Sequence, residues 1–239
     1  MAALPHDYEE ILFAKDTFYV FDDFKHYVSA DDFTSVATDS GTISVLDAVG
    51  GRLTINASDG SVVDNDESYV RTTTEMFLVA DNKPLRFECR MQYTEANTDD
   101  ANVFVGFIDA AGANLLVDDG AGPKTTASGF GIFKVDGGTV WKCFSSKSTT
   151  QTITASTTTA GGASYQVLEV EFQPISSTEG MVYFWVDGVQ LVDSNQKPIS
   201  HSITFASATE MHFVPCYAKA GSANSETPKI SNAFAAQLR

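Results

Sequence analysis

The sequence has few cysteines, few histidines and no long apolar run, and each shortage argues against a class of protein. Its 239 residues include three cysteines and four histidines, with no CxxC and no spaced Cys/His cluster, so we expect neither a zinc site nor a disulfide framework. No apolar run approaches the roughly 20 residues that cross a bilayer. The opening MAALPHDYEEILF has no basic region and no long apolar stretch, so we expect no signal peptide and synthesis in a cytoplasm.

Basic residues are also scarce, and the net charge is −16. The first 120 residues hold 7 basic and 23 acidic side chains, whereas the remainder holds 8 of each. Such a chain does not bind nucleic acid by counterion release, and an anionic membrane surface repels it. Its acidity favours solubility or a basic protein partner.

The residues that are abundant build a β-sheet core. Apolar residues make up 43% of the chain, and 17 of them are phenylalanine. The stretch PLRFECRMQYT alternates apolar and polar side chains, the period-2 pattern of a half-buried strand. Short strand-like runs joined by Gly, Asp and Asn turns continue to the end, with almost no helical periodicity. This pattern predicts an all-β fold, a two-sheet antiparallel β-sandwich or jelly roll, as a single domain over residues 18–239.

Several hairpins can be placed within that domain. VYFWVDGVQL predicts two strands around Asp187-Gly188, GFGIFKVDGGTVWKCFSS predicts a second hairpin, and GTISVLDAVGGRLTINAS predicts a third. The polar tract at 145–164 predicts an exposed edge strand, and KISNAFAAQL is expected to return beside the first strand. The cysteines Cys89, Cys143 and Cys216 lie inside apolar runs and are expected to be buried free thiols.

Residues 1–17 stand apart from the strand series as an N-terminal arm or short helix. Its apolar residues include Tyr8, Ile11, Leu12 and Phe13. A segment this short is not stable alone, so we expect these four side chains to dock either on their own domain or on a neighbouring subunit.

No catalytic or cofactor motif emerges from the residues themselves. GxSxG, HExxH and glycine-rich phosphate loops are absent, and we expect no cofactor and no metal. The stretch DNDES (64–68) lacks the glycine and glutamate of a calcium loop. Glu169 and Glu171 lie on one face of a predicted strand, as solvent-facing sheet residues or, in the alternative, as a carboxylate pair.

The unit SYQVLEVEFQPISSTEGMVYFWVDGVQL resembles the late strands of concanavalin A-like sandwiches, as in laminin-G-like modules, legume-type lectins and family 16 glycoside hydrolases. The resemblance implies the sandwich fold. The Glu-x-Asp-x-x-Glu strand of the hydrolases is absent, and Glu169 and Glu171 are the nearest candidates. A lectin-like module that binds surface glycans is the alternative function, with Trp141, Tyr183 and Trp185, and also Phe133, either stacking on sugars or packing in the core.

The opening FYVFDDFKHYVSADDFTSVATDSGTISVLDAVGGRLTINAS is similar to the start of virion structural proteins of tailed bacteriophages. In these, an aromatic DDF strand precedes a Gly-Gly hairpin. This resemblance implies a non-enzymatic capsid decoration, cement or head-fibre protein, located in the virion. Its expected partners are other virion proteins and further copies of itself.

Overall fold

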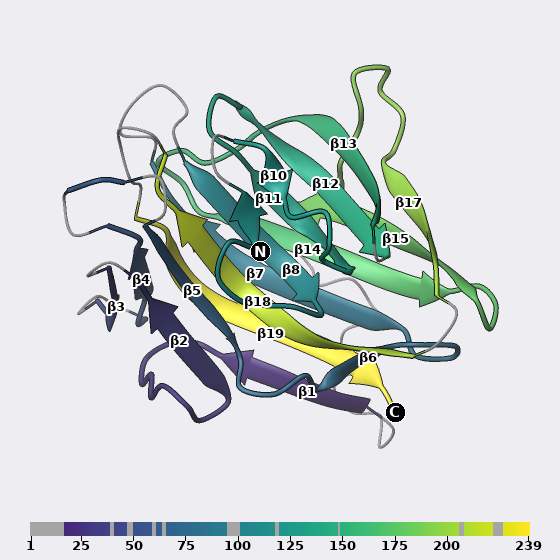
Figure 1. Cartoon of the computed structure of the whole chain (residues 1–239), viewed down its shortest axis with the longest axis horizontal. Coiled ribbons are helices and arrows are strands. Elements are labelled where there is room, and N and C mark those ends of the chain that lie inside the picture. Colours follow the sequence, from purple (N-terminus) through teal and green to yellow (C-terminus); the bar gives the residue numbers. More distant parts are fainter. Residues whose placement is uncertain are drawn as a thin grey trace.

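The computed structural model describes residues 17–38, 41–46, 50–58, 61–63, 66–94, 101–117, 120–147, 149–205, 208–221 and 227–239. Across these residues the chain forms strands and turns and no helix. The strands build two large sheets, and all of the strand pairs described are antiparallel. The predicted all-β two-sheet sandwich is therefore confirmed (Figure 1).

The nine-stranded sheet runs through β16 (Val189–Gln190), β15 (Glu179–Val186), β14 (Gln166–Pro174), β7 (Leu85–Gln92), β19 (Lys229–Leu238), β4 (Leu53–Asn56) and β3 (Thr42–Val45), with β1 (Thr17–Asp22) beside β19 and β17 (Ser200–Thr204) beside β15. Asp187 and Gly188 both have positive φ, 54° and 72°, which is the turn geometry expected of the β15–β16 hairpin. The last strand lies beside the first, as the sequence predicted (Figure 1).

The eight-stranded sheet runs through β13 (Thr150–Thr159), β12 (Val140–Lys147), β11 (Gly129–Lys134), β8 (Asn102–Ile108), β18 (Thr209–Lys219), β5 (Glu67–Thr72) and β2 (Phe33–Ala37), with β6 (Phe77–Val79) beside β18. A two-stranded sheet of β9 (Leu116–Val117) and β10 (Gly122–Pro123) is separate from both. The Ser/Thr-rich β13 lies at the edge of its sheet, which confirms the edge strand predicted from its composition.

The main core lies between the two sheets and is rich in phenylalanine. Phe107 is at its centre, with the rings of Phe77, Phe87, Phe130 and Phe213 at centroid distances of 4.8, 5.5, 5.5 and 5.6 Å. Aromatic pairs of this kind contribute about 0.5–1.5 kcal/mol each beyond the burial of their area.

Strand β7 confirms the alternation that predicted it, because its buried and partly exposed residues alternate along all eight positions. The three cysteines are buried free thiols, also as expected. Burial raises the pKa of all three thiols, so they remain protonated and unreactive in the folded protein.

Candidate functional site

The outer face of the eight-stranded sheet is closed to solvent over its central strands, because it carries a second apolar core there. Residues 109–128, of which 118 and 119 are not described, follow β8 and include β9 and β10; we call them the covering segment. This core combines sheet residues with four from the covering segment: Tyr69, Phe104, Ile108, Phe133, Val135, Phe144, Val214 and Tyr217 from the sheet side, and Ala111, Leu115, Leu116 and Ala127 from the segment. Both faces of β8 and β11 are consequently buried.

Buried polar groups hold the covering segment to the sheet. The Glu67 carboxylate accepts the backbone N–H of Asn114 at 2.9 Å and the hydroxyl of Tyr217. Lys219 donates from Nζ to Asn114 Oδ1 at 2.9 Å and to the Leu116 carbonyl at 3.2 Å. Burial and the nearby Glu67 raise the pKa of Tyr217, so its hydroxyl stays protonated as a donor. Asn114, at φ 55°, is the point where both anchors meet.

A groove lined by hydroxyl groups lies where the β12–β13 hairpin approaches β17. Its volume is about 420 Å³. Its lining combines one ammonium group, one apolar side chain and six hydroxyls: Ser145, Ser146, Lys147, Thr150, Thr152, Ser202, Ile203 and Thr204. Lys147 Nζ donates to the Thr209 hydroxyl. No carboxylate lines this groove, so the groove can offer hydrogen bonds and one positive charge but no acid–base pair.

His201 lies beside this groove and is 4% exposed. Its Nδ1 contacts the Ser145 hydroxyl and its Nε2 contacts the Thr154 hydroxyl, both at 3.0 Å, while the Phe184 ring packs edge-on at 5.0 Å. Burial lowers the pKa of His201 to about 4. The ring is therefore neutral near pH 7. The burial of His201 was not predictable from the sequence, because its serine and threonine partners come from strands distant in the chain.

Tyr183 and Trp185 lie side by side on the outer face of β15 and are half-buried. Their ring centroids are 6.0 Å apart, with 39° between the ring planes. The opposite face of the same strand, with Val182, Phe184 and Val186, enters the main core. The bulky residues on both faces of VYFWV are thus explained: one face is core and the other is an aromatic surface.

Glu169 and Glu171 share that outer face on the next strand, β14. Glu169 forms an ion pair with Arg86, with Oε2 to Nη2 at 2.6 Å. Burial raises the pKa of Glu169, and Arg86 acts in the opposite direction. Glu171 accepts from the Gln173 amide at 2.5 Å. Each carboxylate therefore has its own polar partner on this sheet face, and neither lines the hydroxyl-lined groove. Glu169 is 7% exposed, so the expectation that it faces solvent was wrong.

Two of the aromatic residues considered for sugar stacking are instead core residues. Trp141 is 0% exposed, donates from Nε1 to Gln166 Oε1 at 3.1 Å and packs edge-on against Tyr93. Phe133 belongs to the second core. Neither ring presents a face to solvent, so of the four candidates only Tyr183 and Trp185 remain accessible.

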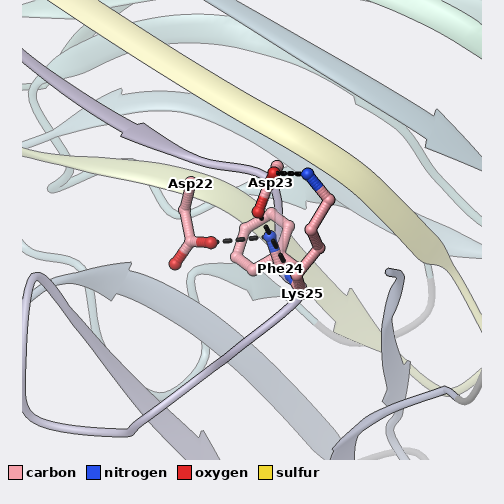
Figure 2. Close-up of polar contacts among 4 residues, drawn as sticks. All are labelled: Asp22, Asp23, Phe24 and Lys25. Carbon is pink, nitrogen blue, oxygen red and sulfur yellow. Dashed lines mark hydrogen bonds and ion pairs between the residues drawn. The ribbon is translucent and has the colours of Figure 1, made fainter. Parts of the chain in front are cut away.

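The most exposed aromatic rings among the described residues belong to β1. Tyr19 and Phe21 are 54% and 53% exposed. Leu238, the last residue of the neighbouring strand β19, is 39% exposed. Figure 2 shows the turn that follows the strand: Asp22 Oδ1 accepts the backbone N–H of Phe24 at 2.6 Å, and the Asp23 carboxylate accepts from Lys25. This local bonding is typical of aspartate in turns.

The remaining sequence predictions concern the N-terminal arm, the DNDES stretch, metal sites and membrane spans. Tyr8, Ile11, Leu12 and Phe13 are outside the described part, and so are two residues of the DNDES stretch, 64 and 65. Within the described part, no group of three or more His, Cys, Asp or Glu side chains could hold a metal ion. The described residues also include no helix with the length and apolarity needed to span a membrane.

Comparison with known structures places the fold in the concanavalin A-like, lectin-like β-sandwich class. The endo-1,3-β-glucanase from Streptomyces sioyaensis is similar over 94% of this chain and 98% of that protein, with a TM-score of 0.60 and 14% identity. The carbohydrate recognition domain of Emp47p is similar over 93% of this chain and 95% of that protein, with a TM-score of 0.58 and 9% identity. Peanut lectin is similar over 92% of this chain and 97% of that protein, with a TM-score of 0.50 and 12% identity.

At these identities the similarity shows the fold alone. No protein-family model matches the sequence, and no curated protein matches it.

Proposed function

We propose that this chain is a non-enzymatic structural protein of a tailed-bacteriophage particle, acting through protein–protein contacts as a capsid decoration, cement or head-fibre component. The observation that carries the proposal is the surface of β1, where Tyr19 and Phe21 are each more than half exposed. Exposed aromatic side chains gathered on a strand are typical of a surface that another protein covers. The sequence similarity of the opening residues to virion proteins supplies the kind of particle.

The architecture also supports a structural role. Apolar side chains fill the space between the sheets and, through the covering segment, the outer face of the eight-stranded sheet. The described cysteines are buried and protonated, so oxidation outside a cell does not reach them. A protein built in this way resists unfolding without needing a reactive group.

The experiment that tests this proposal is particle association. Phage particles from the source of the gene would be purified by density gradient, and the protein would be sought in them by mass spectrometry. We expect a constant number of copies per particle. In a second assay, purified protein is added to particles that lack it: wild type should bind, and the double variant with Tyr19→Ser and Phe21→Ser should not. Absence from purified particles would overturn the proposal.

A carbohydrate-binding module is the second candidate, and the pair of Tyr183 and Trp185 favours it. Two adjacent rings on an outer sheet face, beside Ser200 in the strand register and Glu171 on the other side, combine an apolar platform with hydroxyl and carboxylate groups. Emp47p and peanut lectin, a carbohydrate recognition domain and a lectin, share the fold. Aromatic rings of this kind stack on sugar faces, whereas the polar neighbours bind hydroxyls.

A glycan array separates the two candidates. Binding of a defined glycan that is lost in Trp185→Ala and retained in Val189→Ala, an exposed control on β16, would favour the module. If the folded wild type binds no glycan, the carbohydrate-binding module is ruled out and the structural role is the one candidate left. Catalysis is not part of either candidate, and an assay of β-1,3-glucan cleavage with Glu169→Gln as control tests that exclusion.

A further inference from the structure

The surface of β1 has three features that together describe an incomplete sheet edge. We call Tyr19, Phe21 and Leu238 the β1 patch. Tyr19 faces outward opposite Ala236, Phe21 opposite Phe234 and Thr17 opposite Leu238, so the patch forms an apolar band across two strands. Val20, between the two exposed rings, points the other way and is buried in the main core. The band is therefore a continuous outer surface of a firmly packed strand.

The second feature is the free side of the strand. Among the described residues, β1 pairs with β19 and with no other strand. The other side of its backbone is a sheet edge that no described strand occupies. An exposed edge of this kind is a template for pairing, which proteins usually block with charge, proline or a bulge. The strand TFYVFD has no proline, and its one charged residue is Asp22 at its end.

The third feature is the segment that enters the strand. Residues 1–16 lie outside the described part and lead directly into Thr17. Ile11 and Phe13 are two residues apart, as are Tyr19 and Phe21, so an extended segment would place both pairs on one face. From Thr17 back to Tyr8 an extended chain reaches about 30 Å, which is long enough to lie along the six-residue β1 of another copy.

The sequence between these elements disfavours pairing within one chain. To lie along its own β1, the segment would have to reverse over residues 14–16, which are Ala-Lys-Asp. Tight hairpin turns strongly prefer Asn-Gly, Asp-Gly or Gly-Gly pairs, because both central residues need positive φ. The three hairpins of this protein that were predicted from sequence have such residues at their turns, and residues 14–16 do not. The sequence at 14–16 therefore does not favour a tight hairpin back along its own β1.

We propose that residues 8–13 of one copy add as a strand to the open edge of β1 in a second copy and cover its β1 patch. Ile11 and Phe13 of the first copy then lie against Tyr19 and Phe21 of the second. This inference rests on the proposed structural function and names the partner of its carrying surface as another copy of the same chain. Strand addition of this kind obtains affinity from backbone hydrogen bonds and selectivity from the alternate side chains.

The experiment measures the oligomeric state of the full chain by sedimentation over a range of concentrations. Three double variants are compared: Tyr19→Ser with Phe21→Ser, Ile11→Ser with Phe13→Ser, and the control Ile175→Ser with Val189→Ser. The control residues are 65% and 70% exposed and lie away from β1. We expect both test variants to weaken association by about 100-fold or more, since each removes two buried aromatic or aliphatic contacts, while the control matches wild type. Circular dichroism confirms that each variant is folded.

A cross-linking experiment identifies the donor of the strand. Phe13→Cys and Phe21→Cys are introduced into two differently tagged copies, and the native thiols are buried and do not compete. A disulfide between the two copies supports the proposal. With both substitutions in one chain, a bond formed only within that chain, or a monomeric wild type, would overturn it, as would oligomers unaffected by either test variant.

Particle association distinguishes this inference from the function on which it rests. A monomer that is nevertheless present in purified particles would refute strand exchange and leave the structural role standing. An oligomer that depends on β1 but is absent from purified particles would support strand addition and refute the structural role in the particle.

Discussion

Acidification should destabilise this protein through His201. The side chain is enclosed by the hydroxyls of Ser145 and Thr154 and the ring of Phe184, none of which carries a charge, and burial lowers its pKa from 6.5 to about 4. In the unfolded chain the imidazole regains its ordinary pKa. Between these two values the unfolded state binds a proton that the folded state does not, so the free energy of unfolding falls as pH falls.

The sign and window follow from that difference. Above pH 6.5 His201 is neutral in both the folded and the unfolded state, so it does not change the free energy of unfolding with pH. From 6.5 down to about 4 the stability decreases, and below that range the contribution is constant. At about 1.4 kcal/mol for each pH unit, the full loss is about 3 kcal/mol. Burial also lowers the pKa of His212, which adds a loss of the same sign in the wild type.

Urea unfolding across this pH range measures the effect in wild type, His201→Gln and His26→Gln. Glutamine can hydrogen-bond to the two hydroxyls but does not titrate, so the His201 variant should lose less stability on acidification than wild type, by about 3 kcal/mol. His26 is exposed, and its variant should follow the wild-type curve. If the His201→Gln curve runs parallel to wild type over the whole range, the reasoning is refuted.

Three further predictions concern packing. Phe107→Ala should reduce the free energy of unfolding by about 3–5 kcal/mol in urea titrations, because four rings lose a shared neighbour; a loss below about 1 kcal/mol would contradict its central place. Gly131→Ala should cost about 1–3 kcal/mol, since a methyl group there meets the Val105 carbonyl, and an unchanged melting temperature would contradict this. Glu67→Ala should make the covering segment easier to cleave in limited proteolysis, because the segment loses a buried anchor; equal cleavage rates would show that apolar contacts alone hold it.

Much of the fold could be predicted because strand alternation and turn residues are local signals. The buried side of β7 follows from PLRFECRMQ alone, and the β15–β16 and β11–β12 hairpins follow from Asp-Gly and Gly-Gly turns. The return of the last strand beside the first was also predictable, since its apolar residues needed a partner. The clustering of apolar residues at period 2 was sufficient to define two stacked layers.

The functional surfaces were less predictable, because alternation shows that two faces differ without showing which is covered. In VYFWV both faces are bulky, so the sequence could not decide whether Phe184 or Trp185 enters the core. Trp141 was open to the same ambiguity, and the structure places it in the core. The partners of His201 come from β12 and β13, over 45 residues before it in the chain, and no single-sequence pattern connects them.

The covering segment determines which surfaces of this fold offer accessible aromatic side chains. Leu115 and Leu116 stand in a stretch otherwise rich in alanine, glycine and aspartate, and they close the second core over β8 and β11. With that face of the eight-stranded sheet filled by the protein itself, the accessible aromatic side chains are left on the other sheet, at β15 and at β1. Apart from the hydroxyl-lined groove, the surfaces that offer aromatic rings for contact are therefore the outer face and the edge of the nine-stranded sheet, and among the described residues β1 combines the most exposed rings with a side that pairs with no other strand.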